Sequence, residues 1–174
     1  MRLYFFAFLF PILFACKEKG QDENNKNRSE KKEDMILMNQ QMMRDESAEI
    51  NEYIKANKLD MIKSGTGLRY HIVPGTGAPV QISSHSRISI SYNLSELDGT
   101  PLYSYSKEKP FTFASGRGEI PRGMEEAIMQ MKPGDKAKLI IPTHLAYGKT
   151  GDDKKIGPGF ILVCELEFLN IENQ

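Results

Sequence analysis

The chain has 174 residues, and its 23 Lys and Arg residues balance its 23 Asp and Glu residues, giving a formal net charge of +0 at pH 7. Because nucleic-acid-binding proteins carry a basic field that a balanced chain lacks, we do not expect a nucleic-acid partner. The length suits one modest domain with extensions, built around a single core.

The chain begins with a short apolar segment that ends at a cysteine. Residues 1–16 read MRLYFFAFLFPILFAC, with one Arg ahead of the apolar run. A run of this length favours a secretory signal over a membrane-spanning helix. Leu13, Ala15 and Cys16 resemble the bacterial lipoprotein signal, in which the cysteine is lipidated and becomes the new N-terminus. An ordinary signal peptide with a coincidental cysteine and a retained apolar anchor are the alternatives, and all three predict export to the cell envelope.

The lipoprotein interpretation carries expectations about location and disulfides. A lipidated Cys16 anchors the protein to a membrane of the envelope, and Lys17 followed by Glu18 favours the outer membrane, on its periplasmic side or at the surface. Cys164 is then the only remaining thiol, so we expect no internal disulfide despite the oxidising surroundings.

Two segments separate the signal from the globular part. Residues 17–34, KEKGQDENNKNRSEKKED, contain no apolar side chain and both signs of charge, which predicts a disordered tether. Over residues 35–65, apolar residues recur at near-helical intervals with a break around Asp45-Glu46, which predicts a helical extension of one or two helices. Packing on the following domain and self-association through residues 35–63 both remain open, since methionine-rich faces are adaptable.

From Leu68 onward the apolar period changes to two. Within RISISYNL at residues 87–94, Ile88, Ile90 and Tyr92 alternate with polar residues, which predicts a strand with one buried face. Further strands are expected at 69–73, 111–114, 137–142 and 160–169.

One segment in this region has helical rather than strand periodicity. Residues 119–135, EIPRGMEEAIMQMKPGD, predict a short helix that starts near Pro121 and stops at Pro133-Gly134. Its apolar face, at i, i+3, i+4 and i+7, consists of Met124, Ala127, Ile128 and Met131. Such a short helix is unstable alone, so it must lie on the sheet. Strands without βαβ alternation then predict an α+β fold with an antiparallel sheet.

The reactive side chains form no recognisable catalytic or metal-binding pattern. His71, His85 and His144 are isolated from one another and from Cys164, without metal-ligand spacing. We therefore expect no metal and no cofactor. Aromatic and apolar residues at strand ends and in loops predict instead a small apolar binding pocket.

The run KPFTFASGRGEIPRGMEEAIMQMKPGDKAKLIIPTHLAYGKTG resembles the FKBP-type peptidyl-prolyl cis–trans isomerases. The motifs TGLRYHIVPGTG and ISYNLSELDG precede it and GPGFILVCELEFL follows it, in the family's order. The resemblance implies a bent antiparallel β-sheet wrapped around one short α-helix over residues 66–174, after an N-terminal helical extension.

The resemblance also implies the residues of the site. The catalytic positions are Tyr92, Phe111, Ile120 and Tyr147. The other substrate-binding positions are Leu102, Tyr103, Phe113, Pro121, Met124, Ile156 and Cys164. The Ile120 N–H and the Tyr147 hydroxyl would donate hydrogen bonds to carbonyls of a bound peptide, and Met124 would form the floor of the pocket.

The sequence departs from the family pattern inside this predicted pocket. Met124 stands where the family has a tryptophan, Cys164 where it has an aromatic residue, and Tyr103 where it has an aspartate. The departures predict a somewhat larger, softer and less acidic pocket.

The resemblance implies a peptidyl-prolyl cis–trans isomerase of the bacterial envelope that acts on Xaa-Pro bonds of exported proteins and assists their folding. The alternatives are a weakly active or inactive proline-peptide-binding chaperone or assembly factor, and a structural subunit of an envelope machine. With its signal and its Lys/Glu-rich segment, the chain is most similar to the lipid-anchored FKBP-type lipoproteins of Bacteroidetes associated with gliding motility. The expected partners are proline-containing segments of exported proteins, and a membrane through the lipid anchor.

Overall fold

The computed structural model describes residues 19–172 of the chain, so the signal segment and Cys16 lie outside the described residues. The chain divides into two compact units, Met1–Met42 and Met43–Gln174. The first helix runs through the boundary between them, and all the other elements belong to the second unit.

The first element is a single helix, α1 (Lys19–Ala56), which corrects two expectations. The segment expected to be a disordered tether is helical from Lys19 onward, and the helix continues through Asp45-Glu46 without a break. Lys, Glu, Gln and Arg are good helix formers, and extending an existing helix needs no new nucleation, so a segment without a core can still be helical. Glu46 does not interrupt the helix. Its carboxylate instead accepts a hydrogen bond from the Thr143 N–H of the following domain.

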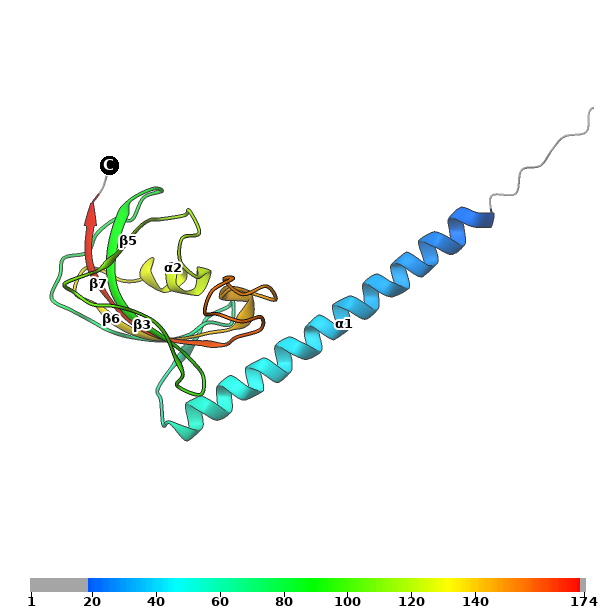
Figure 1. Ribbon diagram of the computed structural model, residues 1–174, viewed down its shortest axis with the longest axis horizontal. Coiled ribbons are helices and arrows are strands. Elements are labelled where there is room, and N and C mark those ends of the chain that lie inside the picture. Colours follow the sequence, from blue (N-terminus) through cyan, green and yellow to red (C-terminus); the bar gives the residue numbers. More distant parts are fainter. Residues whose placement is uncertain (1–18, 173–174) are drawn as a thin grey trace, which may run out of the picture. The chain divides into compact units, whose positions relative to one another are not determined.

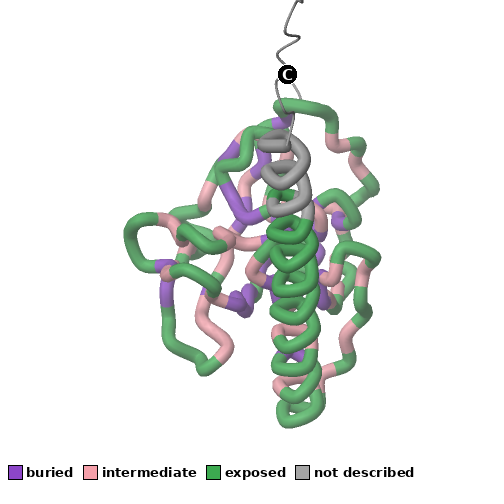
Figure 2. Tube along the Cα trace, turned by 90° about the vertical axis from the view of Figure 1, so that its right-hand side faces the viewer, coloured by how far each residue is buried: buried purple, intermediate pink, exposed green. Residues whose placement is uncertain are grey.

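The apolar residues of α1 fall into an exposed group and a buried group. Figure 2 shows exposed residues along much of the helix, and the large apolar ones among them are Met35, Ile36, Leu37, Met38, Met42 and Met43. Further along, Ile50 is only 1% exposed and packs with Ile140, Ile161 and Val163, a set called the outer core below. The packing interpretation is therefore confirmed for the last part of α1. No helix among the described residues has the length and apolar composition needed to cross a membrane.

The second unit is built on a seven-stranded antiparallel sheet. Its strands are β1 (Ile62–Lys63), β2 (Arg69–Val73), β3 (Arg87–Glu96), β4 (Pro101–Tyr105), β5 (Phe111–Ala114), β6 (Lys136–Ile141) and β7 (Leu162–Glu172). Their order is β1-β2-β6-β7-β3-β4, and β5 pairs with β3. Every predicted strand is present with small shifts at its ends, whereas β1 and β4 were not predicted. Residue 62 was expected to be helical, but α1 ends at Ala56 and residue 62 lies in β1.

The second helix, α2 (Arg122–Ile128), is shorter than the segment 119–135 predicted. After Ile128 the backbone tightens into i to i+3 hydrogen bonds, from Gln130 N to Ala127 O and from Met131 N to Ile128 O, each 3.0 Å. Pro121 is the N-cap rather than a residue of the first turn. The predicted apolar face is confirmed, because all four of its members are buried.

The helix lies inside the curve of the sheet (Figure 1), where its apolar face meets the alternate residues of the strands. This larger cluster of buried residues, called the inner core below, is centred on Met124, Leu139, Cys164 and Phe168. Along β6 and β7 successive residues point to opposite faces, so Leu139 and Cys164 belong to the inner core while Ile140 and Val163 belong to the outer core. The α+β fold expected from the sequence, a bent antiparallel sheet around one short helix after an N-terminal helix, is thereby confirmed.

Candidate active site

An aromatic cluster lies on the helix-facing side of the sheet, where β4 and β5 pair with the middle of β3. Tyr92 of β3 is 5.1 Å from Tyr105 of β4 and 6.1 Å from Phe111 of β5, between ring centroids. Tyr105 and Phe111 meet edge to face at 5.1 Å, and Phe111 stacks on Phe113 at 6.3 Å. These are favourable arrangements of ring quadrupoles. We refer to these four residues as the aromatic cluster.

The structure brings the predicted pocket residues together although they come from distant parts of the sequence. All of them except Pro121 belong to the inner core or pack directly against it, and Pro121 is itself buried as the N-cap of α2. Met124 is 0% exposed and Phe113 3%, so they support the site from below, whereas Tyr92, Phe111 and Tyr147 are half-buried. The half-buried rings are therefore the part of this group that a substrate can reach.

The predicted hydrogen-bond donors are available. Within the described residues, neither the backbone N–H of Ile120 nor the hydroxyl of Tyr147 donates to any acceptor. Burial raises the pKa of Tyr147, and the nearby charge of Asp152 adds to that effect. Burial likewise raises the pKa of Tyr92 strongly. Both phenols are therefore neutral at physiological pH and can act as donors.

Cys164 fills its position as a small apolar residue. It lies in β7 between Leu94 of β3 and Leu139 of β6 and is 0% exposed. Burial raises the pKa of its thiol, with a smaller contribution from Glu165, which keeps the sulfur neutral and unreactive. Cys164 thus contributes packing and no nucleophile to the site.

Tyr103, which stands where the family resemblance implies an aspartate, contacts an acidic residue of another segment. Its hydroxyl donates a hydrogen bond to the carboxylate of Asp152, which lies in the loop between Tyr147 and Ile156. Lys155 of the same loop donates to the Leu102 carbonyl at 2.9 Å, and its ammonium lies 5.3 Å from the centre of the Tyr103 ring.

Sequence reasoning missed Tyr105, Asp152 and Lys155. Tyr105 could have been found from the alternation of tyrosines at 103 and 105, which places both on one side of a strand. No sequence signal identifies Asp152 or Lys155, because their partners lie far away in the chain. Among residues 19–172, no group of three His, Cys, Asp or Glu side chains is placed to hold a metal ion.

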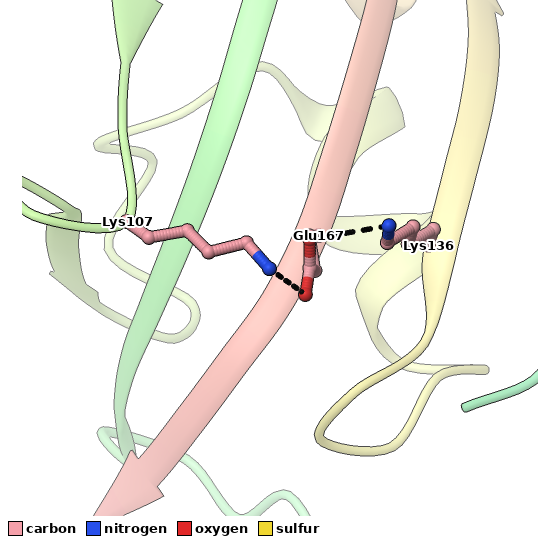
Figure 3. A network of polar contacts seen from close by, with 3 residues as sticks. All are labelled: Lys107, Lys136 and Glu167. Atoms are coloured by element: carbon pink, nitrogen blue, oxygen red, sulfur yellow. Dashed lines mark hydrogen bonds and ion pairs between the residues drawn. The ribbon is translucent and has the colours of Figure 1, made fainter. Parts of the chain in front are cut away.

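A polar hollow of about 670 Å³ is lined mainly by charged and polar residues of the sheet, and Tyr92 and Tyr105 of the aromatic cluster also border it. Figure 3 shows its ion-pair network, in which Glu167 of β7 binds Lys107 at 2.7 Å and Lys136 at 3.8 Å. Lys138 and Glu165 form a second pair at 2.9 Å. Exposed pairs of this kind contribute little to stability and belong to a solvated face.

Comparison with known proteins identifies the family. A family model described as FKBP-type peptidyl-prolyl cis-trans isomerase matches residues 78–169. The peptidyl-prolyl cis-trans isomerase Fkbp12 of Drosophila melanogaster is 34% identical over 102 residues, which cover 58% of this chain and 94% of that protein. The human isomerase FKBP2 is 40% identical over 78 residues, which cover 44% of this chain and 55% of FKBP2.

Solved structures support the same assignment. The crystal structure of FkpA from Escherichia coli matches with a TM-score of 0.62 and 25% identity, covering 90% of this chain and 74% of FkpA. A peptidyl-prolyl cis-trans isomerase from Pseudomonas syringae matches with a TM-score of 0.59 and 26% identity, covering 72% of this chain and 92% of that protein. With the aromatic cluster, the two available donors and these similarities, the chain belongs to the FKBP-type peptidyl-prolyl cis–trans isomerase family.

Proposed function

We propose that this protein rotates Xaa-Pro peptide bonds in exported proteins of the bacterial envelope and so assists their folding. The observation that carries the catalytic part is the pairing of a half-buried aromatic cluster with two donors, the Ile120 N–H and the Tyr147 hydroxyl, that have no acceptor within the described residues. Such a site binds an apolar ring and the carbonyls beside it, which is the chemistry of a proline-containing peptide.

The reaction requires no acid, base or nucleophile. Rotation about an Xaa-Pro bond breaks amide resonance over a barrier of about 18–20 kcal/mol, and no covalent bond changes. The twisted amide has a smaller carbonyl dipole than the planar one, so water stabilises the planar form more strongly. When the proline ring of a bound peptide packs against Tyr92 and Phe111, it leaves that water, and the planar form loses this extra stabilisation.

The donors then act on geometry. Hydrogen bonds from Ile120 and Tyr147 hold the carbonyls on either side of the bond, and they accelerate rotation to the extent that they fit the twisted form better than the planar one. Each tenfold increase in rate requires only about 1.4 kcal/mol of such preference. The chemically quiet residues of the site are therefore sufficient for the reaction.

A protease-coupled isomerisation assay on Xaa-Pro peptides tests the catalytic proposal. Purified protein lacking residues 1–16 is compared with the Phe111→Ala variant, and the wild type should accelerate the slow phase while the variant is much weaker. Equal rates with and without the wild-type protein would refute the proposal.

The envelope location rests on the first sixteen residues, which lie outside the described residues. In this proposal Cys16 carries the lipid, and an anchored domain acts on proteins that fold after export. Stable anchoring needs more than one acyl chain, so Cys16→Ser should leave the protein uncleaved or unacylated, lower fatty-acid labelling and alter its membrane association. Equal radioactive label in Cys16→Ser and wild-type cells would remove the lipoprotein assignment.

A second candidate is a proline-peptide-binding chaperone or assembly factor of an envelope machine of the gliding-motility type. Two features favour it: Met124 and Cys164 stand where the family resemblance implies aromatic residues, and α1 exposes a run of large apolar residues between Met35 and Met43. Ile50 is already packed in the outer core. Self-association through the predicted 35–63 region would therefore use this exposed run. A protein that suppresses aggregation of an unfolded client without accelerating isomerisation would favour this candidate over the first.

A further inference from the structure

We propose that Tyr103, Asp152 and Lys155 form a clamp that holds the loop 147–156 against β4 and thereby positions the Tyr147 hydroxyl and the Ile156 side chain. This inference rests on the proposed isomerase function and adds positioning residues to it. The clamp joins two segments of the chain that are not adjacent in sequence and that border the aromatic cluster.

Asp152 organises the loop through one of its carboxylate oxygens. Its Oδ1 accepts hydrogen bonds from the backbone N–H groups of Lys154 and Lys155, each at 3.0 Å, and of Ile156 at 2.8 Å. Its own N–H donates to the Ile156 carbonyl at 3.0 Å. A carboxylate that caps three amides in this way fixes the turn that brings Ile156 back toward the sheet.

The other carboxylate oxygen connects the loop to the strand. Asp152 Oδ2 accepts the hydrogen bond from the Tyr103 hydroxyl. Partial burial acts to raise the pKa of Asp152, but the bonds from Tyr103 and from the three backbone amides outweigh it and lower the pKa. Both oxygens are thus occupied within the protein, one holding the loop's shape and the other its attachment.

Lys155 provides a second attachment beside the first. Its ammonium donates to the Leu102 carbonyl at 2.9 Å and lies 5.3 Å from the centre of the Tyr103 ring, within the range of a cation–π contact. Because Leu102 and Tyr103 are neighbours in β4, the loop is attached at two adjacent points and resists rotation about either one.

Two glycines allow the loop to adopt the conformation that the clamp holds. Gly148 and Gly151 adopt φ values of +64° and +77°, a region that glycine enters without strain. Tyr147 and Ile156 lie at the two ends of this loop, and Gly151 N donates to the Tyr147 carbonyl at 3.2 Å. Since the Tyr147 hydroxyl has no acceptor within the described residues, its position depends on the backbone that the clamp holds.

A double-mutant cycle separates positioning from general stability. Tyr103→Phe removes the hydroxyl and keeps the ring under Lys155, and it should lower kcat/KM by about three- to tenfold. In a Tyr147→Phe background the same change should have little effect, because the donor that the clamp positions is already absent. Asp153→Asn is the matched control: it removes a carboxylate from the same loop at a φ of +56° that Asn tolerates, and it should leave kcat/KM unchanged.

The results distinguish the clamp from the function on which it rests. If the wild type is active but Tyr103→Phe has no effect, or if its effect is equal in both backgrounds, the positioning role is overturned while the isomerase stands. If the wild type shows no isomerisation, the proposed function fails. Amide hydrogen exchange then tests whether the clamp holds the loop. The amides of Lys154, Lys155 and Ile156 should exchange at least about tenfold faster in Asp152→Ala and in Tyr103→Phe than in the wild type. Unchanged exchange in the variants that fold would overturn the clamp.

Discussion

The inner and outer cores lie on opposite faces of the same strands, yet they consist of different kinds of side chain. The inner core combines α2 with an aromatic cluster in which Tyr92, Tyr105 and Phe111 are half-buried, whereas the outer core is a small aliphatic set formed where Ile50 meets β6 and β7. The half-buried rings keep surface that a substrate can use. The outer core has no such surface, so its contribution is to hold the end of α1 on the sheet.

The comparison predicts that substitutions on the two faces change different properties. Variants of the outer core should lower the free energy of unfolding and leave kcat/KM unchanged. Variants of the half-buried rings of the aromatic cluster should mainly lower kcat/KM. The following variants test that separation.

The largest effect is expected from Ile50→Ala in the outer core. Removing a fully buried aliphatic side chain typically lowers the free energy of unfolding by about 2–5 kcal/mol, through lost burial and the cavity left behind. Urea unfolding measures it, and kcat/KM of the folded protein should stay unchanged. Met38→Ala, on the exposed part of α1, is the control and should stay within about 0.5 kcal/mol of the wild type.

Phe111→Ala should lower kcat/KM by about ten- to a hundredfold, or about 1.4–2.7 kcal/mol of barrier, because it opens the cluster between Tyr92 and Tyr105 to water. Its effect on unfolding should be smaller than that of Ile50→Ala, since Phe111 is half-buried. Tyr53→Ala removes a partly buried ring packed against the outer core and should not change kcat/KM. Comparable loss of activity in Tyr53→Ala would mean that the two faces are not separate.

Tyr147→Phe should lower kcat/KM by about three- to tenfold, because it removes one donor whose hydrogen bond is partly replaced by water. Peptide isomerisation kinetics of the two variants side by side give the ranking. A greater loss in Tyr147→Phe than in Phe111→Ala would show that hydrogen bonding, rather than the apolar environment, dominates catalysis.

Glu167→Gln on the outer face should cost at most about 1 kcal/mol of unfolding free energy, although Glu167 pairs with both Lys107 and Lys136. The cost should shrink in high salt, because screening weakens exposed pairs. Glu165→Gln, which loses only Lys138, is the matched comparison and should cost less. An effect as large as that of Ile50→Ala would assign the polar hollow a structural role.

The smallest effect is expected from pH. Isomerase activity should be flat between about pH 6 and 8, because the proposed donors are a backbone amide and a phenol with a raised pKa. The stabilisation from keeping Tyr147 neutral is present below the ordinary tyrosine pKa and is lost as pH rises toward the folded value. That of Asp152, whose pKa is lowered, is present above the ordinary aspartate pKa and is lost as pH falls through the folded value. A bell-shaped activity profile between pH 6 and 8 would require a titrating group in the mechanism.

The strands and the apolar face of α2 could be predicted because one physical pattern decides each of them. Alternation along residues 87–94 and the spacing of Met124, Ala127, Ile128 and Met131 reflect burial on one face, and the structure buries those faces. The upstream extent of α1 could not be predicted, because a polar segment without a core is compatible with either helix or coil. The outcome depends on the last part of α1, which the outer core holds in a helix that the polar segment extends.

The aromatic cluster was predicted only in part, and the clamp not at all. Tyr92, Phe111 and Phe113 lie in strands that the sequence identifies, whereas β4, which carries Tyr103 and Tyr105, lies directly after a turn and has too few apolar residues to show alternation. The contact between Tyr103 and Asp152 joins residues far apart in the sequence, and it forms only once the loop is docked on β4. Such contacts follow from the tertiary arrangement and leave no periodic trace.

The buried thiol of Cys164 can report how often the folded domain opens. Because the thiol is fully buried between β3 and β6 and its pKa is raised, an alkylating reagent can modify it only while the strands are apart. Under reagent concentrations at which reclosing is faster than labelling, the modification rate reports the population of the open state. A proteomic labelling experiment on intact cells would thus measure how stable the domain is in the cell, without purification.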